Sequence, residues 1–183
     1  EFEAAFLERF SGLLDASDHK WRFDRLLTDD VRWKDSRSER SAIAKRILPL
    51  LSPAERAKAT ARLAVFNKSA NAPAMLKDLP ESRQDWGLVF HRAQLQRRAG
   101  KTQAAAKLLL SAPTDPQQIA ELDEWWAERR DVAYDALKEG DYKLAYRLTR
   151  DAGPLSVNPL KEQQFMAGWI ALRYLQNDAA AET

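Results

Sequence analysis

Apolar and polar positions nowhere alternate convincingly along this chain in the period of two that marks a β-strand, and only six glycines are available to bound such strands. The apolar residues instead gather in segments that begin and end with helix-capping signals. The pattern predicts an all-α protein. Typical helices of about 10–14 residues would divide the chain into roughly nine to eleven helices.

Three positions carry a signal for the start of a helix. Ser52 offers a hydroxyl N-cap, a proline follows at the first helical position, where its missing N–H costs nothing, and Glu55 completes a capping box. An aspartate at 115 and an asparagine at 158, each followed by a proline, repeat this arrangement. We therefore expect helices to begin near residues 53, 116 and 159.

Three glycines carry the opposite signal. Gly100, Gly140 and Gly153 follow helical runs that end at residues 99, 139 and 152, and glycine is the residue that most often terminates a helix. A proline directly after Gly153 strengthens that stop.

Two of these stops belong to an internal repeat. Residues 89–112 and 131–152 each form a predicted helix, a tight glycine turn and a shorter helix rich in alanine and leucine. Residues 168–183 repeat the first half of this unit, with Asn177 in the place of the glycine, and residues 20–51 form a looser copy. Periods of this size are typical of an α-solenoid of antiparallel, tetratricopeptide-like helix pairs, and we expect one such domain over residues 1–183.

The segment QFMAGWIALRYL, residues 164–175, is apolar on nearly every side and so needs neighbours on several sides. Gly168 inside this helix costs about 1 kcal/mol relative to alanine. Burial of Phe165, Trp169 and Leu172 would return roughly 1.5–3 kcal/mol each. We expect the covering helix to begin in residues 177–183, so that the chain is a piece of a longer solenoid, with one face left exposed or covered by a second copy.

Composition and charge narrow the possible chemistry. The 183 residues are 45% hydrophobic and 31% charged, and the net charge of +2 gives no general reason to bind nucleic acid or a membrane. No apolar run reaches the roughly 18 residues of a membrane span. Without cysteine, without a second ligand at metal spacing from His19 or His91, and without a glycine-rich phosphate loop, we expect no metal, no cofactor and no catalytic residue in this chain.

Six tryptophans are the remaining candidates for contact with a ligand. Trp125 and Trp126 are adjacent, so on a helix their side chains point about 100° apart. We expect one to face the core and the other to meet the neighbouring repeat or a groove. Together with Arg129 and Arg130 they are our candidates for contact with a glycan or another partner.

Three segments resemble the N-terminal superhelical region of the soluble lytic murein transglycosylases. They are WWAERR at residues 125–130, GDYKLAY at 140–146 and FMAGWIALR at 165–173, and the upstream segments 22–30, 57–66 and 87–101 fit more weakly. The resemblance implies a non-catalytic scaffold that positions peptidoglycan glycan strands in the bacterial periplasm. It also implies a C-terminal lysozyme-like domain that cleaves the MurNAc–GlcNAc bond and leaves 1,6-anhydro-muramic acid ends.

The family's catalytic motifs are missing from this chain. It contains no Glu-Ser-Gly/Ala-Phe and no GLMQ segment, and its only Glu-Ser pair, Glu81-Ser82, lacks the context of that motif. The chain alone is therefore expected not to be an enzyme. The alternative is a tetratricopeptide-like adaptor that binds a protein or peptide on its concave face. Binding of RNA through the basic first third is a weaker third possibility, since basic and aromatic residues form no stacking pattern there.

We predict that the purified chain releases no anhydro-muropeptides from peptidoglycan, because the glutamate that acts as acid and base in the family has no counterpart here. Chromatography of the soluble products after incubation with purified sacculi checks this. Release of anhydro-muropeptides by the pure chain would contradict the expected absence of a catalytic domain.

Overall fold

The structure is a computed structural model that describes residues 5, 9–10, 12–28, 37–79 and 85–176. Over these residues it contains nine α-helices and two short helical turns, with no strand, which confirms the predicted all-α helical-repeat fold. Contacts group the chain into two compact units, Glu1–Pro80 and Glu81–Thr183, and each is described by itself. The single domain over residues 1–183 stays a prediction.

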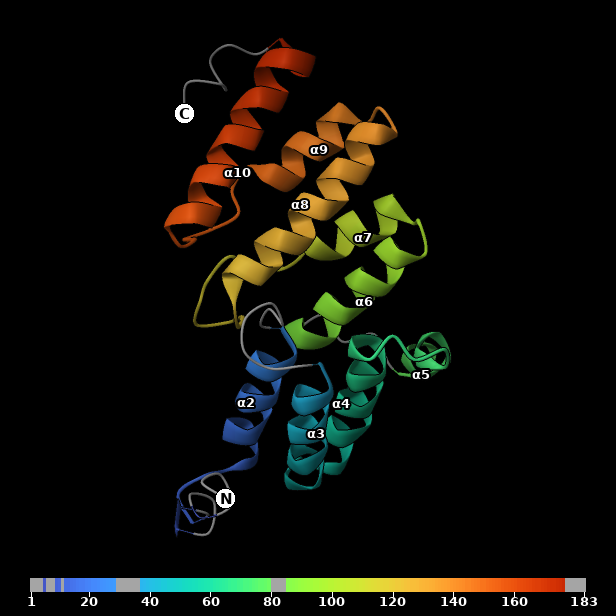
Figure 1. Cartoon of the computed structure of the whole chain (residues 1–183), viewed down its shortest axis with the longest axis vertical. Coiled ribbons are helices and arrows are strands. Elements are labelled where there is room, and N and C mark those ends of the chain that lie inside the picture. Colours follow the sequence, from blue (N-terminus) through green and yellow to red (C-terminus); the bar gives the residue numbers. More distant parts are fainter. Residues whose placement is uncertain (1–4, 6–8, 11, 29–36, 80–84, 177–183) are drawn as a thin grey trace. The chain divides into compact units, whose positions relative to one another are not determined.

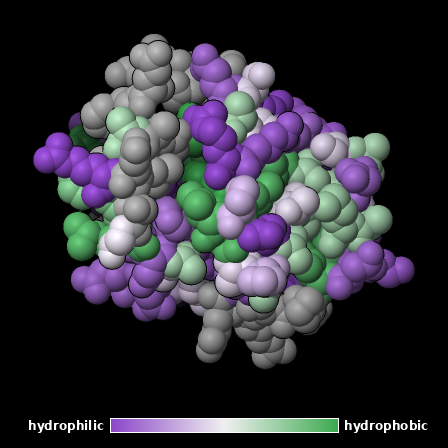
Figure 2. All heavy atoms as spheres, turned by 90° about the horizontal axis from the view of Figure 1, so that it is seen from below, coloured by the Kyte–Doolittle hydropathy of each residue, from purple (hydrophilic) through white to green (hydrophobic). Residues whose placement is uncertain are grey.

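The first unit consists of α2 (Ala16–Thr28), α3 (Arg37–Ile47), the 3-10 turn η1 (Leu48–Leu50), α4 (Pro53–Phe66) and α5 (Ala72–Lys77). The predicted helix start at residue 53 is confirmed, because Ser52 Oγ accepts the Glu55 N–H at 3.3 Å. Helices α2, α3 and α4 share a core of Phe23, Leu27, Ala44, Ile47, Leu51, Ala59, Leu63 and Phe66. Seen from below, hydrophilic and hydrophobic residues are interspersed over the surface, with hydrophobic ones at the centre of the view and toward both of its sides (Figure 2).

A buried arginine joins two helices of this unit. Arg62 of α4 is 2% exposed and forms an ion pair with Asp24 of α2. Its guanidinium carbon lies 5.3 Å from the centre of the Phe23 ring, a cation–π distance. Lys20 binds the other oxygen of the Asp24 carboxylate at 2.7 Å. The core of the first unit therefore includes a charged contact that aligns α2 with α4.

The second unit consists of α6 (Trp86–Arg98), α7 (Thr102–Leu109), α8 (Leu122–Lys138), α9 (Tyr142–Thr149) and α10 (Val157–Ile170), which continues into a π-helical turn, η2 (Ala171–Leu175). Helices α6 and α7 form one hairpin and α8 and α9 a second, and α10 packs beside α8 and α9 (Figure 1). One continuous core, which includes Phe90, Leu109, Trp126, Leu148 and Ile170, runs through all five helices.

The glycine turns of the two hairpins have the same geometry. Gly100 and Gly140 adopt φ of +70° and +79°, a left-handed conformation that favours glycine. In each turn the glycine N–H binds the carbonyl three residues earlier, at 2.9 and 3.1 Å, and the next N–H binds the carbonyl five residues earlier, at 2.9 Å. This is the Schellman arrangement that ends a helix. The helix pairs predicted around these two glycines are confirmed.

Two arginine–glutamate links connect the three long helices of this unit. Arg97 of α6 donates two hydrogen bonds to Glu128 of α8, at 2.6 and 3.1 Å. Arg130 of α8 donates to Glu162 of α10 at 3.1 and 3.2 Å. The hydrogen bond and the charge of Glu128 raise the pKa of Arg97, which keeps that buried link ionised. The links fix the order and register of α6, α8 and α10.

The helix predicted to begin at residue 116 is absent. The Asp115 carboxylate accepts the Gln117 N–H at 2.9 Å, which closes a turn instead of a helix, and Glu121 adopts a left-handed φ of +56°. Helix α8 begins only at Leu122. The prediction was wrong because an aspartate before a proline is equally suited to cap a helix or to close a local turn.

Two other predicted boundaries differ from the structure. Helix α10 begins at Val157, with Ser156 at the N-cap position, two residues before the predicted start. Helix α9 ends at Thr149, so the helical run expected to reach residue 152 was wrong. Residues 150–153 form a loop, in which Asp151 and Gly153 adopt φ of +54° and +96°.

The apolar C-terminal helix is only partly covered. Met166 and Ile170 are buried, as a helix between neighbours requires, but Phe165, Trp169 and Leu172 are 74%, 40% and 58% exposed. Trp169 meets Tyr174 edge-on, whereas Phe165 and Leu172 are left open to solvent, and an exposed face is one of the two outcomes expected for this helix. Asn177 and the rest of residues 177–183 lie outside the described residues.

Alanine substitutions at the three left-handed glycines should differ in cost. Gly100→Ala and Gly140→Ala add a Cβ that meets no atom within 4 Å, so each should lower the free energy of unfolding by about 1–2 kcal/mol through backbone strain alone. Gly153→Ala should cost more, because its Cβ would lie 2.8 Å from Thr114 Cβ and 2.9 Å from the Thr114 carbonyl oxygen. Urea unfolding of the three variants measures this, and a Gly153→Ala variant no less stable than the other two would contradict it.

Candidate functional site

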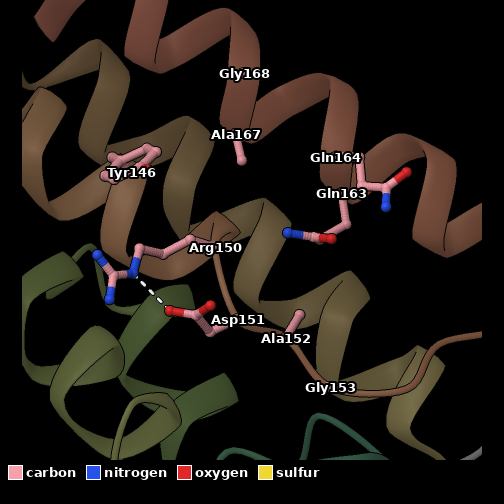
Figure 3. A pocket seen from close by; sticks show the side chains of 9 residues that line it. All are labelled: Tyr146, Arg150, Asp151, Ala152, Gly153, Gln163, Gln164, Ala167 and Gly168. Carbon is pink, nitrogen blue, oxygen red and sulfur yellow. Dashed lines mark hydrogen bonds and ion pairs between the residues drawn. The ribbon is translucent and has the colours of Figure 1, made fainter. Parts of the chain in front are cut away.

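A cleft of about 310 Å³ opens between α9 and α10. Figure 3 shows its walls, which come from α9, from the loop that follows α9, and from the middle of α10. The lining residues are Tyr146, Arg150, Asp151, Ala152, Gly153, Gln163, Gln164, Ala167 and Gly168. The volume is at the lower end of the usual range for small-ligand sites, so the cleft suits one small group, such as one unit of a polymer.

The loop that forms one wall is held from beneath by Arg129 of α8. This side chain is 7% exposed, and its Nε donates to the Leu148 carbonyl at 2.7 Å. Its two terminal nitrogens donate to the Arg150 carbonyl at 2.9 Å and to the carbonyls of Arg147 and Asp151 at 3.3 Å each. One guanidinium thus binds four carbonyls at the C-terminal end of α9, where backbone acceptors have no helical partner. We call this contact the Arg129 clamp.

The clamp is a buried charge. Burial lowers the pKa of Arg129 to about 10, against the smaller opposing effect of the Asp151 carboxylate, so the guanidinium stays protonated at neutral pH. A charged donor makes stronger hydrogen bonds than a neutral one, and the negative end of the α9 dipole favours a cation there. The path of the loop is therefore set by α8 as well as by the loop itself.

Backbone conformation confirms that the loop is tightly constrained. A left-handed φ, as at Asp151, costs a non-glycine residue about 1–2 kcal/mol, and such strain persists only where neighbouring contacts impose it. Gly153 is required on the other side, where Thr114 leaves no room for a Cβ. The cleft wall is thus built from a strained loop fixed at both of its ends.

The cleft combines paired charges, amides and one aromatic ring. Arg150 Nε donates to Asp151 Oδ2 at 2.6 Å, and this hydrogen bond, together with the Asp151 charge, raises the pKa of Arg150. The Arg150 guanidinium also lies 5.9 Å from the centre of the Tyr146 ring. Gln163 points from α10 toward the loop and donates to the Thr149 carbonyl at 2.5 Å (Figure 3). Gln164 adds a second, exposed amide.

None of the four residues that the sequence singled out lies in the lining of this cleft. Trp125 and Trp126 are 4% and 1% exposed and belong to the core, where Trp125 packs against Phe90 with ring centres 5.1 Å apart. Trp126 Nε1 donates to Glu162 at 3.0 Å, so it shares that carboxylate with Arg130. Contact of these four residues with a ligand stays a prediction. Of the four, Arg129 shapes the cleft, because it holds the loop that forms one wall.

Sequence reasoning missed the lining residues themselves. Tyr146 and Gln163 occupy ordinary helix positions, and nothing in their local sequence separates them from other surface residues. The available signal was the stop at Gly153 and its following proline, which marked an abrupt change of chain direction next to the repeat.

Other chemistry finds no support in the part of the chain that the structure describes. There, no three His, Asp or Glu side chains gather in a way that would hold a metal ion, and no helix combines the length and apolarity needed to cross a bilayer. His91 is fully buried and its Nδ1 donates to the Gly87 carbonyl at 2.9 Å, which is a structural role.

Comparison with known proteins gives no relative. The chain matches no protein-family model, no curated protein and no solved structure. The geometry of the cleft and the resemblance of the three segments therefore carry the functional argument.

Replacement of Arg129 by lysine should destabilise the second unit far more than the same change at its neighbour. Lysine cannot present the forked donors that reach four carbonyls, so Arg129→Lys should lower the free energy of unfolding by about 2–4 kcal/mol. Arg130→Lys is the matched control, because its partly exposed pair with Glu162 is worth less than about 1 kcal/mol. Urea unfolding followed by circular dichroism compares the two, and equal losses would rule out a special role for the clamp.

Proposed function

We propose that the chain is the helical scaffold of a soluble lytic murein transglycosylase, and that it holds peptidoglycan glycan strands for a catalytic domain elsewhere in the parent protein. In this proposal the parent enzyme acts in the bacterial periplasm, where it cleaves the MurNAc–GlcNAc bond and leaves 1,6-anhydro-muramic acid ends. The chain itself contributes binding and no chemical step.

One observation carries the proposal: the three segments that resemble this family supply parts of the same cleft. The WWAERR segment provides Arg129, which clamps the loop. The GDYKLAY segment provides Tyr146, and the FMAGWIALR segment provides Ala167 and Gly168, all of which line the cleft. Segments that form a site together are more informative than segments scattered over a repeat fold, because repeat architecture alone serves many functions.

The chemistry of the lining supports a polar, uncharged ligand. Arg150 and Asp151 neutralise one another, so the cleft offers hydrogen-bonding groups without demanding a net charge in the ligand. The amides of Gln163 and Gln164 each offer a donor and an acceptor. The Tyr146 ring adds an apolar surface beside them. Sugar rings carry hydroxyl and acetamido groups around apolar ring faces, which matches this combination.

A tetratricopeptide-like adaptor is the second candidate. The observation that favours it is the exposure of Phe165 on α10 and Leu172 on η2, since exposed large apolar side chains are typical of surfaces that bind proteins. Such an adaptor would bind a peptide through this face and would have no use for the polar cleft.

Co-sedimentation with purified sacculi tests the proposed function. The wild-type chain should pellet with sacculi, and Gln163→Ala/Gln164→Ala should reduce the bound amount, because the variant removes two amides from the cleft wall. A loss of about 1.4 kcal/mol would weaken binding tenfold. Gln103→Ala/Gln118→Ala is the matched control, since it removes two amides from outside the cleft.

The result that would overturn the proposal is a wild-type chain that stays in the supernatant at every salt concentration. If the wild type pellets and both double variants bind equally well, the cleft is not the glycan site, and the observation that carries the proposal fails.

A further inference from the structure

Three aromatic side chains form a cluster on the surface of the second unit. Tyr142 of α9 stacks on Tyr174 of η2, with ring centres 4.3 Å apart and planes inclined by 15°. Trp169 of α10 meets Tyr174 edge-on, with ring centres 5.2 Å apart. Tyr142 and Trp169 are 37% and 40% exposed. We call these three residues the aromatic cluster; its packed rings leave part of Tyr142 and part of Trp169 open to solvent.

The aromatic cluster and the cleft lie along the same seam between two antiparallel helices. At one end of the seam Gln163 binds the Thr149 carbonyl, and at the other Tyr174 stacks on Tyr142. Tyr146, which lines the cleft, is four residues beyond Tyr142 and so lies on the same face of α9, about 6 Å along the helix. The polar cleft therefore continues directly into an aromatic surface.

The π-helical turn η2 helps to assemble the aromatic cluster. Trp169 and Tyr174 are five residues apart, and in a regular α-helix their side chains would point about 140° apart. A π-helical turn contains more residues than an α-helical one, which narrows this angle and lets the two rings meet. Such turns are often found at functional sites.

We propose that the cleft and the aromatic cluster form one saccharide-binding seam, in which sugar rings of a glycan stack on the aromatic cluster while the polar groups of a neighbouring sugar bind in the cleft. This deepens the proposed function and depends on it for the class of ligand. The aromatic rings recognise the apolar faces of the sugars, and the amides of Gln163 and Gln164, with the Arg150–Asp151 pair, recognise their hydroxyl and acetamido groups.

A protein helix fits this seam less well. To lie along it, the helix would have to cover the exposed ion pair of Arg150 and Asp151, and desolvation of paired charges opposes association. The rings of the cluster pack on one another, two stacked and one edge-on, and Tyr142 and Trp169 each leave part of their ring exposed. The apolar face of a pyranose ring can stack on such an exposed ring, whereas a docked helix needs a groove that receives its side chains.

The test is a calorimetric titration of the whole chain with the β-1,4-linked tetramer of N-acetylglucosamine, which measures the Kd. Trp169→Ala and Tyr142→Ala should each raise the Kd about 5- to 100-fold, an effect of the size seen when a ring that stacks on a nucleic-acid base is removed. Tyr142→Phe keeps the ring and should bind within about twofold of wild type. The substituted side chains are partly exposed, so circular dichroism should show that all variants keep their helical content.

Two exposed aromatic residues outside the seam provide matched controls. Tyr134 of α8 and Phe165 of α10 are 47% and 74% exposed, and neither belongs to the cleft or to the aromatic cluster. Tyr134→Ala and Phe165→Ala should leave the Kd unchanged. A loss at Phe165→Ala equal to that at Trp169→Ala would overturn the inference, because binding would then use the outer face of α10.

The two proposals fail in different ways. A chain that pellets with sacculi but binds no tetramer, or binds it equally well without Trp169 and Tyr142, overturns the seam and leaves the scaffold function standing. A chain that binds neither sacculi nor tetramer overturns both.

Discussion

The second unit depends on one buried guanidinium. Arg129 of α8 donates to two carbonyls in the last turn of α9 and to two in the loop that follows, so it takes the place of the donors that a further helical turn would supply. The chain must then turn away through a strained loop, and α10 returns at a distance that leaves a cleft. Without this charge at its base, the end of α9 would carry unsatisfied polar groups inside the unit. The end of α9, the loop that follows it and the cleft beside that loop therefore all depend on Arg129.

The charged groups around the cleft are arranged differently from those between the helices. Glu128 and Glu162 form ion pairs between helices, Glu128 with Arg97 and Glu162 with Arg130. Arg150 and Asp151 pair with each other at the surface instead. The first kind of pair holds the helices in register, whereas the second leaves hydrogen-bonding groups near solvent. A ligand that is polar but uncharged gains most from such a surface, and this favours a glycan over an ionic partner.

Much of the fold was predictable because its signals are local. The caps at Ser52 and the turns at Gly100 and Gly140 depend on residues within five positions of one another, and the structure has them as expected. Asp115 failed as a helix start because its side chain can close a turn just as well, and only contacts distant in sequence decide between the two. Capping residues and periodicity thus predicted most of the helices of the second unit, whereas none of the four residues singled out as contacts lies in the cleft lining.

The cleft was beyond sequence reasoning for a physical reason. Arg129 stands next to another arginine in a charged segment and looks like a surface residue; its burial follows from carbonyls 18 to 22 positions later in the chain. An apolar pattern likewise indicates that a helix can be covered but not which side a neighbour takes, so it did not specify that Phe165 would be on the exposed face. The sequence thus specified the helices, and distant contacts specified the site.

The position of α8 has a consequence for how this unit unfolds in part. It is linked to α6 through Glu128, to α9 through the Arg129 clamp, and to α10 through Arg130 and Trp126. Helices in the unit otherwise contact mainly their neighbours in the chain, so partial unfolding can begin at either end and stop at the next helix. Backbone amides at the centre of α8 should then be the last to exchange with solvent. In kinetic terms, the links from α8 to α6, α9 and α10 should make it the slowest helix of the unit to unfold.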